Sequence, residues 1–117
     1  MATNPVTTLR TVRGDDFSSL LTIKNNGVVM DLTDSTVTFT IKENTNVLDS
    51  NASYQQVITA HTDPTAGQTT ISIPRADSAN LALNKYVYDV QLLTSGDKLI
   101  TVLRGDFYVD WDVTKSV

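Results

Sequence analysis

Apolar and polar residues alternate with a period close to two along most of the chain. In residues 34–43, Val37, Phe39 and Ile41 share one side, whereas threonines and a lysine occupy the other. Such alternation predicts a strand with one face on a core and one face in water. Similar segments, rich in the Val, Ile and Thr that suit pleated surfaces, predict strands at residues 7–12, 16–24, 28–32, 34–43, 54–61, 69–73, 85–94 and 98–111.

Turn-forming residues separate these strands. The Asn-Asn-Gly of residues 25–27 and the Asp-Pro and Gly of residues 62–68 predict tight turns, with Gly27 and Gly67 at positive φ. Residues 44–53 predict a long polar loop, and residues 74–83 predict one short helical turn, with Ala76, Ala79 and Leu81 over one end of the core. About eight short strands predict a single all-β domain over residues 1–117, either a β-sandwich or a small barrel.

Composition and charge narrow the possible functions. The 117 residues carry a net charge of −4 without a basic cluster, which argues against binding to nucleic acid or to an anionic membrane surface. No apolar run is long enough to cross a bilayer. The absence of cysteine excludes disulfides and thiolate zinc sites. The first ten residues lack the pattern of a secretory signal, so we expect synthesis in a cytoplasm.

The tripeptide Arg-Gly-Asp, known from integrin ligands, occurs at residues 13–15 and 104–106. Recognition by integrins needs this tripeptide at the tip of an exposed loop. The second copy instead lies within a predicted strand, where Gly105 is expected to mark a bulge or a close approach of another backbone. Gly14 is expected to form a bend between two strands. We therefore interpret both copies as structural, and the first is the better candidate for adhesion.

Residues that carry catalysis or bind metals are few. His61 is the only histidine, and its place beside a turn predicts a solvent-exposed imidazole. Asp110 and Asp112 share one side of an extended strand and could bind calcium, although the spacing of an EF-hand is missing. The sequon at residues 51–53 is interpreted as a chance match. We therefore expect no enzyme, no metal site and no cofactor.

Aromatic residues provide the main candidates for binding a partner. Trp111 ends the last predicted strand and shares a phase with Val113, so with Tyr108 these residues are the candidate partner interface. They lie on or near one of two expected extended arms, residues 1–6 and 110–117. A second possibility is a carbohydrate-binding or host-adhesion module, whose candidate aromatic residues are Tyr54, Tyr86, Tyr88, Tyr108 and Trp111.

Three stretches resemble small β-sandwich domains of tailed-bacteriophage virion proteins, of which the N-terminal domain of baseplate upper proteins is the best-known relative. The first runs from "RGDDFSS" to "FTIKE", the second is "TDPTAGQTTISIPRADSANL", and the third runs from "NKYVYDV" to "DVTKSV". The motif residues of the first stretch are Gly14, Asp15, Phe17, Asp31, Leu32, Thr33, Val37, Phe39 and Ile41.

The resemblance implies an immunoglobulin-like antiparallel β-sandwich with a non-enzymatic role in the virion, reached by assembly inside the host. The expected partners are other virion proteins and further copies of this chain within the particle, without direct nucleic-acid contact or membrane insertion. Baseplate upper proteins continue into further domains, whereas this chain ends at Val117. A tail or baseplate adaptor, a head decoration or a fibre-base subunit is therefore expected. The structural glycines are Gly14, Gly27, Gly67 and Gly105.

Overall fold

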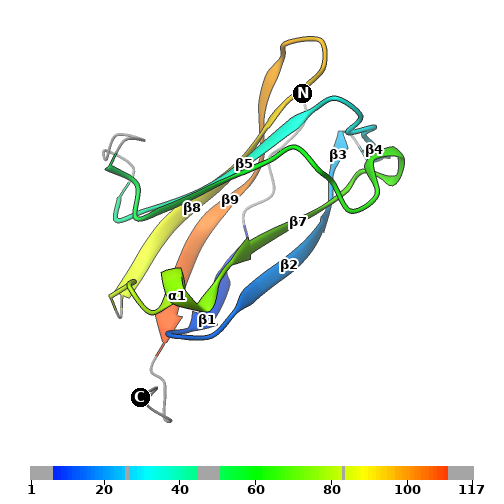
Figure 1. Cartoon of the computed structure of the whole chain (residues 1–117). Coiled ribbons are helices and arrows are strands. Elements are labelled where there is room, and N and C mark those ends of the chain that lie inside the picture. Colours follow the sequence, from blue (N-terminus) through cyan, green and yellow to red (C-terminus); the bar gives the residue numbers. More distant parts are fainter. Residues whose placement is uncertain (1–6, 26, 45–50, 83, 111–117) are drawn as a thin grey trace.

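A computed structural model describes residues 7–25, 27–44, 51–82 and 84–110 (Figure 1). More than half of these residues belong to strands, and helices are confined to single turns. Along the chain the elements are β1 (Leu9–Val12), β2 (Phe17–Thr22), β3 (Lys24–Asn25), β4 (Val28–Val29), β5 (Thr36–Lys42), β6 (Tyr54–Ile58), the 3-10 helix η2 (Pro64–Ala66), β7 (Gln68–Ile73), α1 (Arg75–Ser78), β8 (Asn84–Leu93) and β9 (Leu99–Asp110). The all-β prediction is confirmed.

The described strands form one large sheet and two small ones. The large sheet has the order β1-β9-β8-β5-β6, while β2 pairs with β7 and β3 pairs with β4. Every pairing is antiparallel except that of β1 with β9, which is parallel and joins Leu9 to Phe107 and Val12 to Asp110. The first and last described strands are therefore neighbours.

The core lies between the five-stranded sheet and the β2-β7 pair. The core side predicted for β5 is confirmed, because Val37, Phe39 and Ile41 are fully buried. The side predicted to face water is only partly exposed, since Thr40 is buried there. The rings of Phe17 on β2 and Phe107 on β9 meet edge to face with centroids 5.3 Å apart, which joins the two layers. Ile71 and Ile73 of β7 are also fully buried.

Some predicted elements are shorter than expected. The predicted strand 16–24 divides at Ile23, whose N–H donates to Gly67 O (2.8 Å) and whose carbonyl accepts from Met30 N–H (2.9 Å). The first bond continues the β2-β7 register by one residue, whereas the second turns the Ile23 carbonyl away from that ladder. The predicted strand 28–32 is only β4, and α1 is the predicted helical turn.

The expected packing of the helical turn is partly wrong. Leu81 is buried as predicted, but Ala76 and Ala79 are exposed, and Ser78 is the fully buried residue of α1. The Ser78 hydroxyl accepts the N–H of Gly14 at 2.9 Å, so α1 is anchored to the bend before β2. Gly14, Gly27 and Gly67 have φ of 88°, 80° and 71°, as their predicted bends and turns require.

Candidate interaction site

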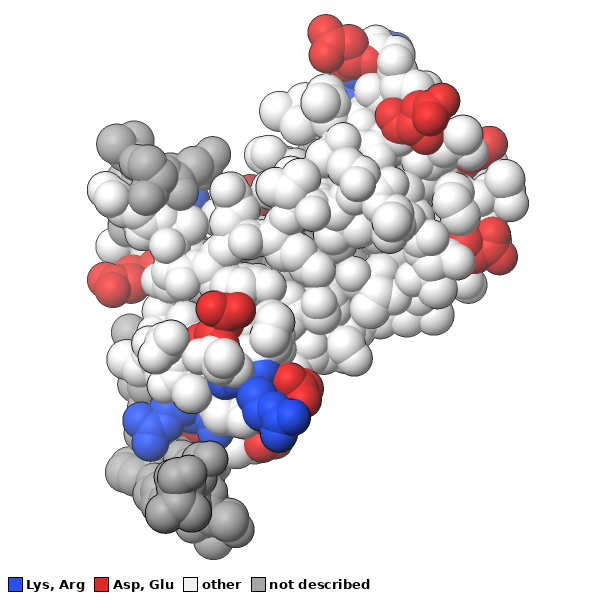
Figure 2. Space-filling view, viewed as in Figure 1, with Lys and Arg blue, Asp and Glu red and all other residues white. Residues whose placement is uncertain are grey.

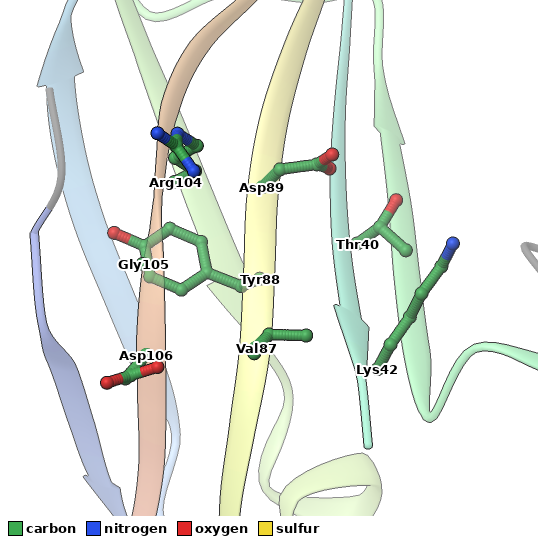
Figure 3. A pocket seen from close by; sticks show the side chains of 8 residues that line it. All are labelled: Thr40, Lys42, Val87, Tyr88, Asp89, Arg104, Gly105 and Asp106. Carbon is green, nitrogen blue, oxygen red and sulfur yellow. The ribbon is translucent and has the colours of Figure 1, made fainter. Parts of the chain in front are cut away.

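The second Arg-Gly-Asp lies inside the five-stranded sheet. Gly105 pairs with Tyr88 in the β8-β9 ladder, and Arg104 and Asp106 project from the outer face, opposite the core, as predicted. They border a hollow of about 360 Å³ (Figure 3). Its lining residues are Thr40, Lys42, Val87, Tyr88, Asp89, Arg104, Gly105 and Asp106. This copy lies in a paired central strand, which is the opposite of a mobile loop tip.

Gly105 is required by a close backbone approach and not by a bulge. The register shift of β9 falls at Val102, because Leu103 pairs with Val90 and Thr101 with Gln91, so the bulge expected at Gly105 is absent. A Cβ atom at Gly105 would overlap the carbonyl oxygen of Thr7 and would lie 2.9 Å from its carbonyl carbon. The alternative expectation of a close approach is therefore confirmed.

Thr7 is held in that place by two hydrogen bonds. Its N–H donates to Arg104 O at 2.9 Å, and its carbonyl accepts the Tyr88 hydroxyl at 2.7 Å. The Tyr88 ring extends past Gly105 toward the segment before β1 (Figure 3). Burial raises the pKa of Tyr88 to about 12, since the charged phenolate loses its hydration there. The Tyr88 hydroxyl is thus a structural donor.

The first Arg-Gly-Asp forms the bend between β1 and β2. The N–H of Arg13 donates to Asp110 O at 3.1 Å, and the N–H of Asp15 donates to Val12 O at 3.0 Å. Together with the bond from Gly14 to Ser78, these contacts fix the backbone of the bend. The tripeptide therefore serves the fold here as well, although Asp15 is exposed.

Tyr108 lies on the outer face of β9, in a small cluster at the end of the strand. The Arg10 guanidinium of β1 lies 4.4 Å from the centre of the Tyr108 ring and 3.1 Å from a carboxylate oxygen of Asp110. Both charged side chains are about half exposed, at 60% and 44%, so their ion pair stabilises the fold by at most about 1 kcal/mol. Tyr108 is half-buried beneath Arg10.

The boundary predicted for the C-terminal arm is wrong by one residue. Asp110 belongs to β9, where it pairs with Val12 and accepts from Arg13 and Arg10. Trp111 and Val113, the other candidate interface residues, lie outside the described residues, as do Asp112 and residues 1–6. The segment of interest is therefore 111–117.

Three of the five aromatic residues considered for sugar binding belong to the fold. Tyr86 and Tyr88 are buried, and Tyr54 packs against Phe39 with centroids 6.2 Å apart. Their hydroxyls donate to main-chain carbonyls, of Ala82 for Tyr86, Thr7 for Tyr88 and Ser72 for Tyr54. Such rings are not available to stack on a sugar.

His61 is not the exposed imidazole that its turn predicts. The ring is half-buried, with Nε2 at 2.8 Å from Ser35 O and Nδ1 at 3.0 Å from Thr69 Oγ1. A carbonyl oxygen only accepts, so Nε2 donates to Ser35 O, and Nδ1 forms the second hydrogen bond with the Thr69 hydroxyl. His61 therefore joins β7 to the loop before β5, and its partners in these bonds are a main-chain carbonyl and the hydroxyl of Thr69, a fully buried residue.

The described residues contain no group of three or more His, Asp or Glu side chains that could hold a metal ion. Every buried side-chain nitrogen or oxygen in the same part of the chain has a hydrogen-bond partner. No described helix is long and apolar enough to cross a membrane. In the part of the chain that the structure covers, the buried polar side chains are thus engaged in hydrogen bonds within the fold.

A surface that the sequence analysis did not single out covers β2 and β7. Neither strand contains a charged residue, and Figure 2 shows an uncharged surface over them, with acidic and basic side chains toward its ends. Leu20 is 55% exposed at the centre of β2. The sequence signal was available, because residues 17–22 and 68–73 are uncharged strands in a chain that is 19% charged.

No family model matches the sequence, and no curated protein is a significant relative.

Proposed function

We propose that the protein is a non-enzymatic structural component of a tailed-phage virion, where it binds other virion proteins. What supports the proposal is that described residues behind the resemblance have structural roles in this fold. In the Asp-Leu-Thr motif, Asp31 accepts the N–H and the hydroxyl of Thr33 at 2.9 and 2.6 Å, and Leu32 is fully buried. Phe17 joins the two layers of the core.

We infer that the fold is an immunoglobulin-like β-sandwich. In that fold, strands B and E lie in one sheet, and C, F and G lie in the other with C′ beside C. The pair β2-β7 then corresponds to strands B and E. The order β9-β8-β5-β6 corresponds to G, F, C and C′. The parallel β1 adds a strand beside G. No described strand occupies the positions of A or D, beside β2 and β7.

A structural role agrees with the way in which the polar residues are used. The only histidine joins two segments of the fold, and the second Arg-Gly-Asp lies in a paired strand. Meanwhile the surface over β2 and β7 is uncharged, and two sequence segments flank the described domain. Such features suit a subunit whose surface contacts other proteins.

The test begins with the genes beside the one that encodes this chain. Capsid or tail genes are expected there, and the protein is expected in purified particles in a fixed ratio to the major capsid protein, measured by mass spectrometry. A variant that lacks residues 111–117 is expected to remain folded but to be absent from particles. Absence of the intact protein from purified particles would refute the virion role. Normal incorporation of the shortened variant would exclude this segment as the attachment element.

A further inference from the structure

The uncharged surface has one strand edge without a described partner. Ser72 of β7 turns its main chain away from β2, because its N–H donates to Gln56 Oε1 and its carbonyl accepts from the Tyr54 hydroxyl, both at 2.9 Å. The side chains of β6 therefore cover the outer edge of β7. The other edge of the pair belongs to β2.

The register shows which groups of β2 face that edge. Opposite residues of an antiparallel pair exchange either both main-chain hydrogen bonds or neither, and the two kinds alternate along the ladder. Ser72 is opposite Ser18 and makes its bonds on the far side, so Ser18, Leu20 and Thr22 point their N–H and C=O groups away from β7. No described residue forms a hydrogen bond with these groups.

This edge also lacks the features that usually keep edge strands apart. Natural edge strands are protected by lysine, proline, bulges or short length. β2 has six residues in regular register, none charged and none proline, with Leu20 exposed on its outer side and Phe17 and Leu21 half-buried on its inner side. Such an edge is suited to accept another strand through main-chain hydrogen bonds.

Residues 111–117 have the sequence of a matching strand. Trp111, Val113, Lys115 and Val117 share one phase, while Asp112, Thr114 and Ser116 share the other. Three of the four residues on the first side are apolar and suit the half-buried core residues of β2, while the long side chain of Lys115 can carry its charge to water. The residues on the other side are all polar. Seven extended residues span about 23 Å, close to the roughly 20 Å of a six-residue strand.

The position of Asp110 favours exchange between two copies. Asp110 borders the same shallow hollow of about 460 Å³ as Phe17 and Ser18, so β9 ends where β2 begins. β2 runs back from that end of the molecule, whereas β9 runs toward it (Figure 1). A chain that continues the direction of β9 therefore leaves its own β2 behind. A two-fold axis near the hollow would bring the segment of each copy alongside β2 of the other.

We propose that residues 111–117 of one copy add to the β2 edge of a second copy, and that the exchange is reciprocal in a symmetric dimer. Trp111 packs beside Phe17 at the hollow, and Thr114 lies near Leu20 on the outer side. This inference does not require the virion setting, so a dimer found for a protein absent from particles would refute only the proposed function.

Single-cysteine variants test the exchange directly, because the chain has no cysteine of its own. Leu20→Cys, carrying a mass tag, is mixed with untagged Thr114→Cys under mild oxidation. The expected product is a covalent dimer that contains one chain of each kind. The matched control is Val57→Cys, which is 63% exposed on the edge strand β6 and is expected to give no such dimer with Thr114→Cys.

Three outcomes of this experiment would overturn the proposal. The first is that no mixed dimer forms, or that Val57→Cys forms it equally well. The second is that the double variant Leu20→Cys/Thr114→Cys gives only a bond within one chain, which would place the segment on its own β2. The third is a bond between Leu20→Cys and Thr3→Cys, which would place residues 1–6 at this edge.

A second measurement uses the full chain without cysteines. Trp111 is the only tryptophan, so its fluorescence reports directly on this segment. Sedimentation is expected to show a dimer, with Trp111 emission shifted to shorter wavelength as concentration rises. Leu20→Pro removes the outward N–H at an edge position that tolerates proline, and is expected to weaken association about tenfold. Leu20→Ala keeps the N–H and is expected to associate nearly normally. If both associate equally with unchanged emission, the main-chain pairing is refuted.

Discussion

Gly105→Ala tests the close approach of Thr7 with the smallest possible perturbation. The added methyl group would overlap the Thr7 carbonyl oxygen and lie 2.9 Å from its carbonyl carbon, so the segment before β1 must move. That movement breaks the bond from Thr7 N–H to Arg104 O and leaves the hydroxyl of Tyr88, a residue only 4% exposed, without its acceptor. One lost bond costs about 1 kcal/mol and a stranded buried hydroxyl about 1–3 kcal/mol. We therefore expect Gly105→Ala to lower the free energy of unfolding by about 2–4 kcal/mol.

Urea unfolding followed by circular dichroism measures this change. Gly96→Ala is the matched control, because an added Cβ there meets nothing closer than Thr94 Oγ1 at 3.8 Å, and its effect should stay within about 0.5 kcal/mol. Tyr88→Phe supplies a second arm, since both substitutions act through Thr7 and their costs should sum to more than that of the double variant. Additive costs, or a Gly105→Ala protein as stable as Gly96→Ala, would show that Thr7 is not held against β9 as described.

Three further predictions concern single side chains. Tyr88 has a pKa of about 12 in the folded protein and about 10 in the unfolded chain. The free energy of unfolding should therefore stay constant below pH 10 and fall between pH 10 and pH 12 by up to about 1.4 kcal/mol per pH unit. The urea midpoint should decrease over this pH range, and the decrease should be smaller in Tyr88→Phe. An equal decrease in both proteins would show that another group causes it. His61→Ala strands the hydroxyl of fully buried Thr69 and should cost about 1–3 kcal/mol by thermal melting, whereas an unchanged melt would mean that its two bonds are weak. Asp106→Glu, which abolishes integrin recognition in adhesive ligands, should leave particle assembly unchanged, and a loss of assembly would show that the Asp106 side chain itself is needed for it.

The strands could be predicted where one face meets the core. In β5, Val37, Phe39 and Ile41 alternate with threonine because successive side chains of a strand point to opposite faces. The core side of β5 could therefore be predicted without knowing its partner strands. The parallel pairing of β1 with β9 could not be predicted in this way. It joins residues about a hundred positions apart, and nothing in the local pattern of either strand states which neighbour it takes.

The candidate site was harder to predict because its contacts are distant along the chain. His61 looked exposed beside its turn, yet its two partners, Ser35 and Thr69, reach it only after folding. Of the two features expected at Gly105, the close backbone approach is present, whereas the register shift lies at Val102, a residue type that gives no signal of a bulge. The open edge of β2 was also missed, because a strand's lack of a neighbour is a property of the whole fold.

The parallel pairing of β1 with β9 also bears on how the domain carries load. Tension applied before Leu9 and after Asp110 would pull the two neighbouring strands past each other lengthwise, because they run in the same direction. The hydrogen bonds of the pair would then share the force and have to break together, whereas a hairpin pulled from its open end separates one bond at a time. A domain linked to its surroundings on both sides would therefore resist extension at the pair formed by its first and last described strands.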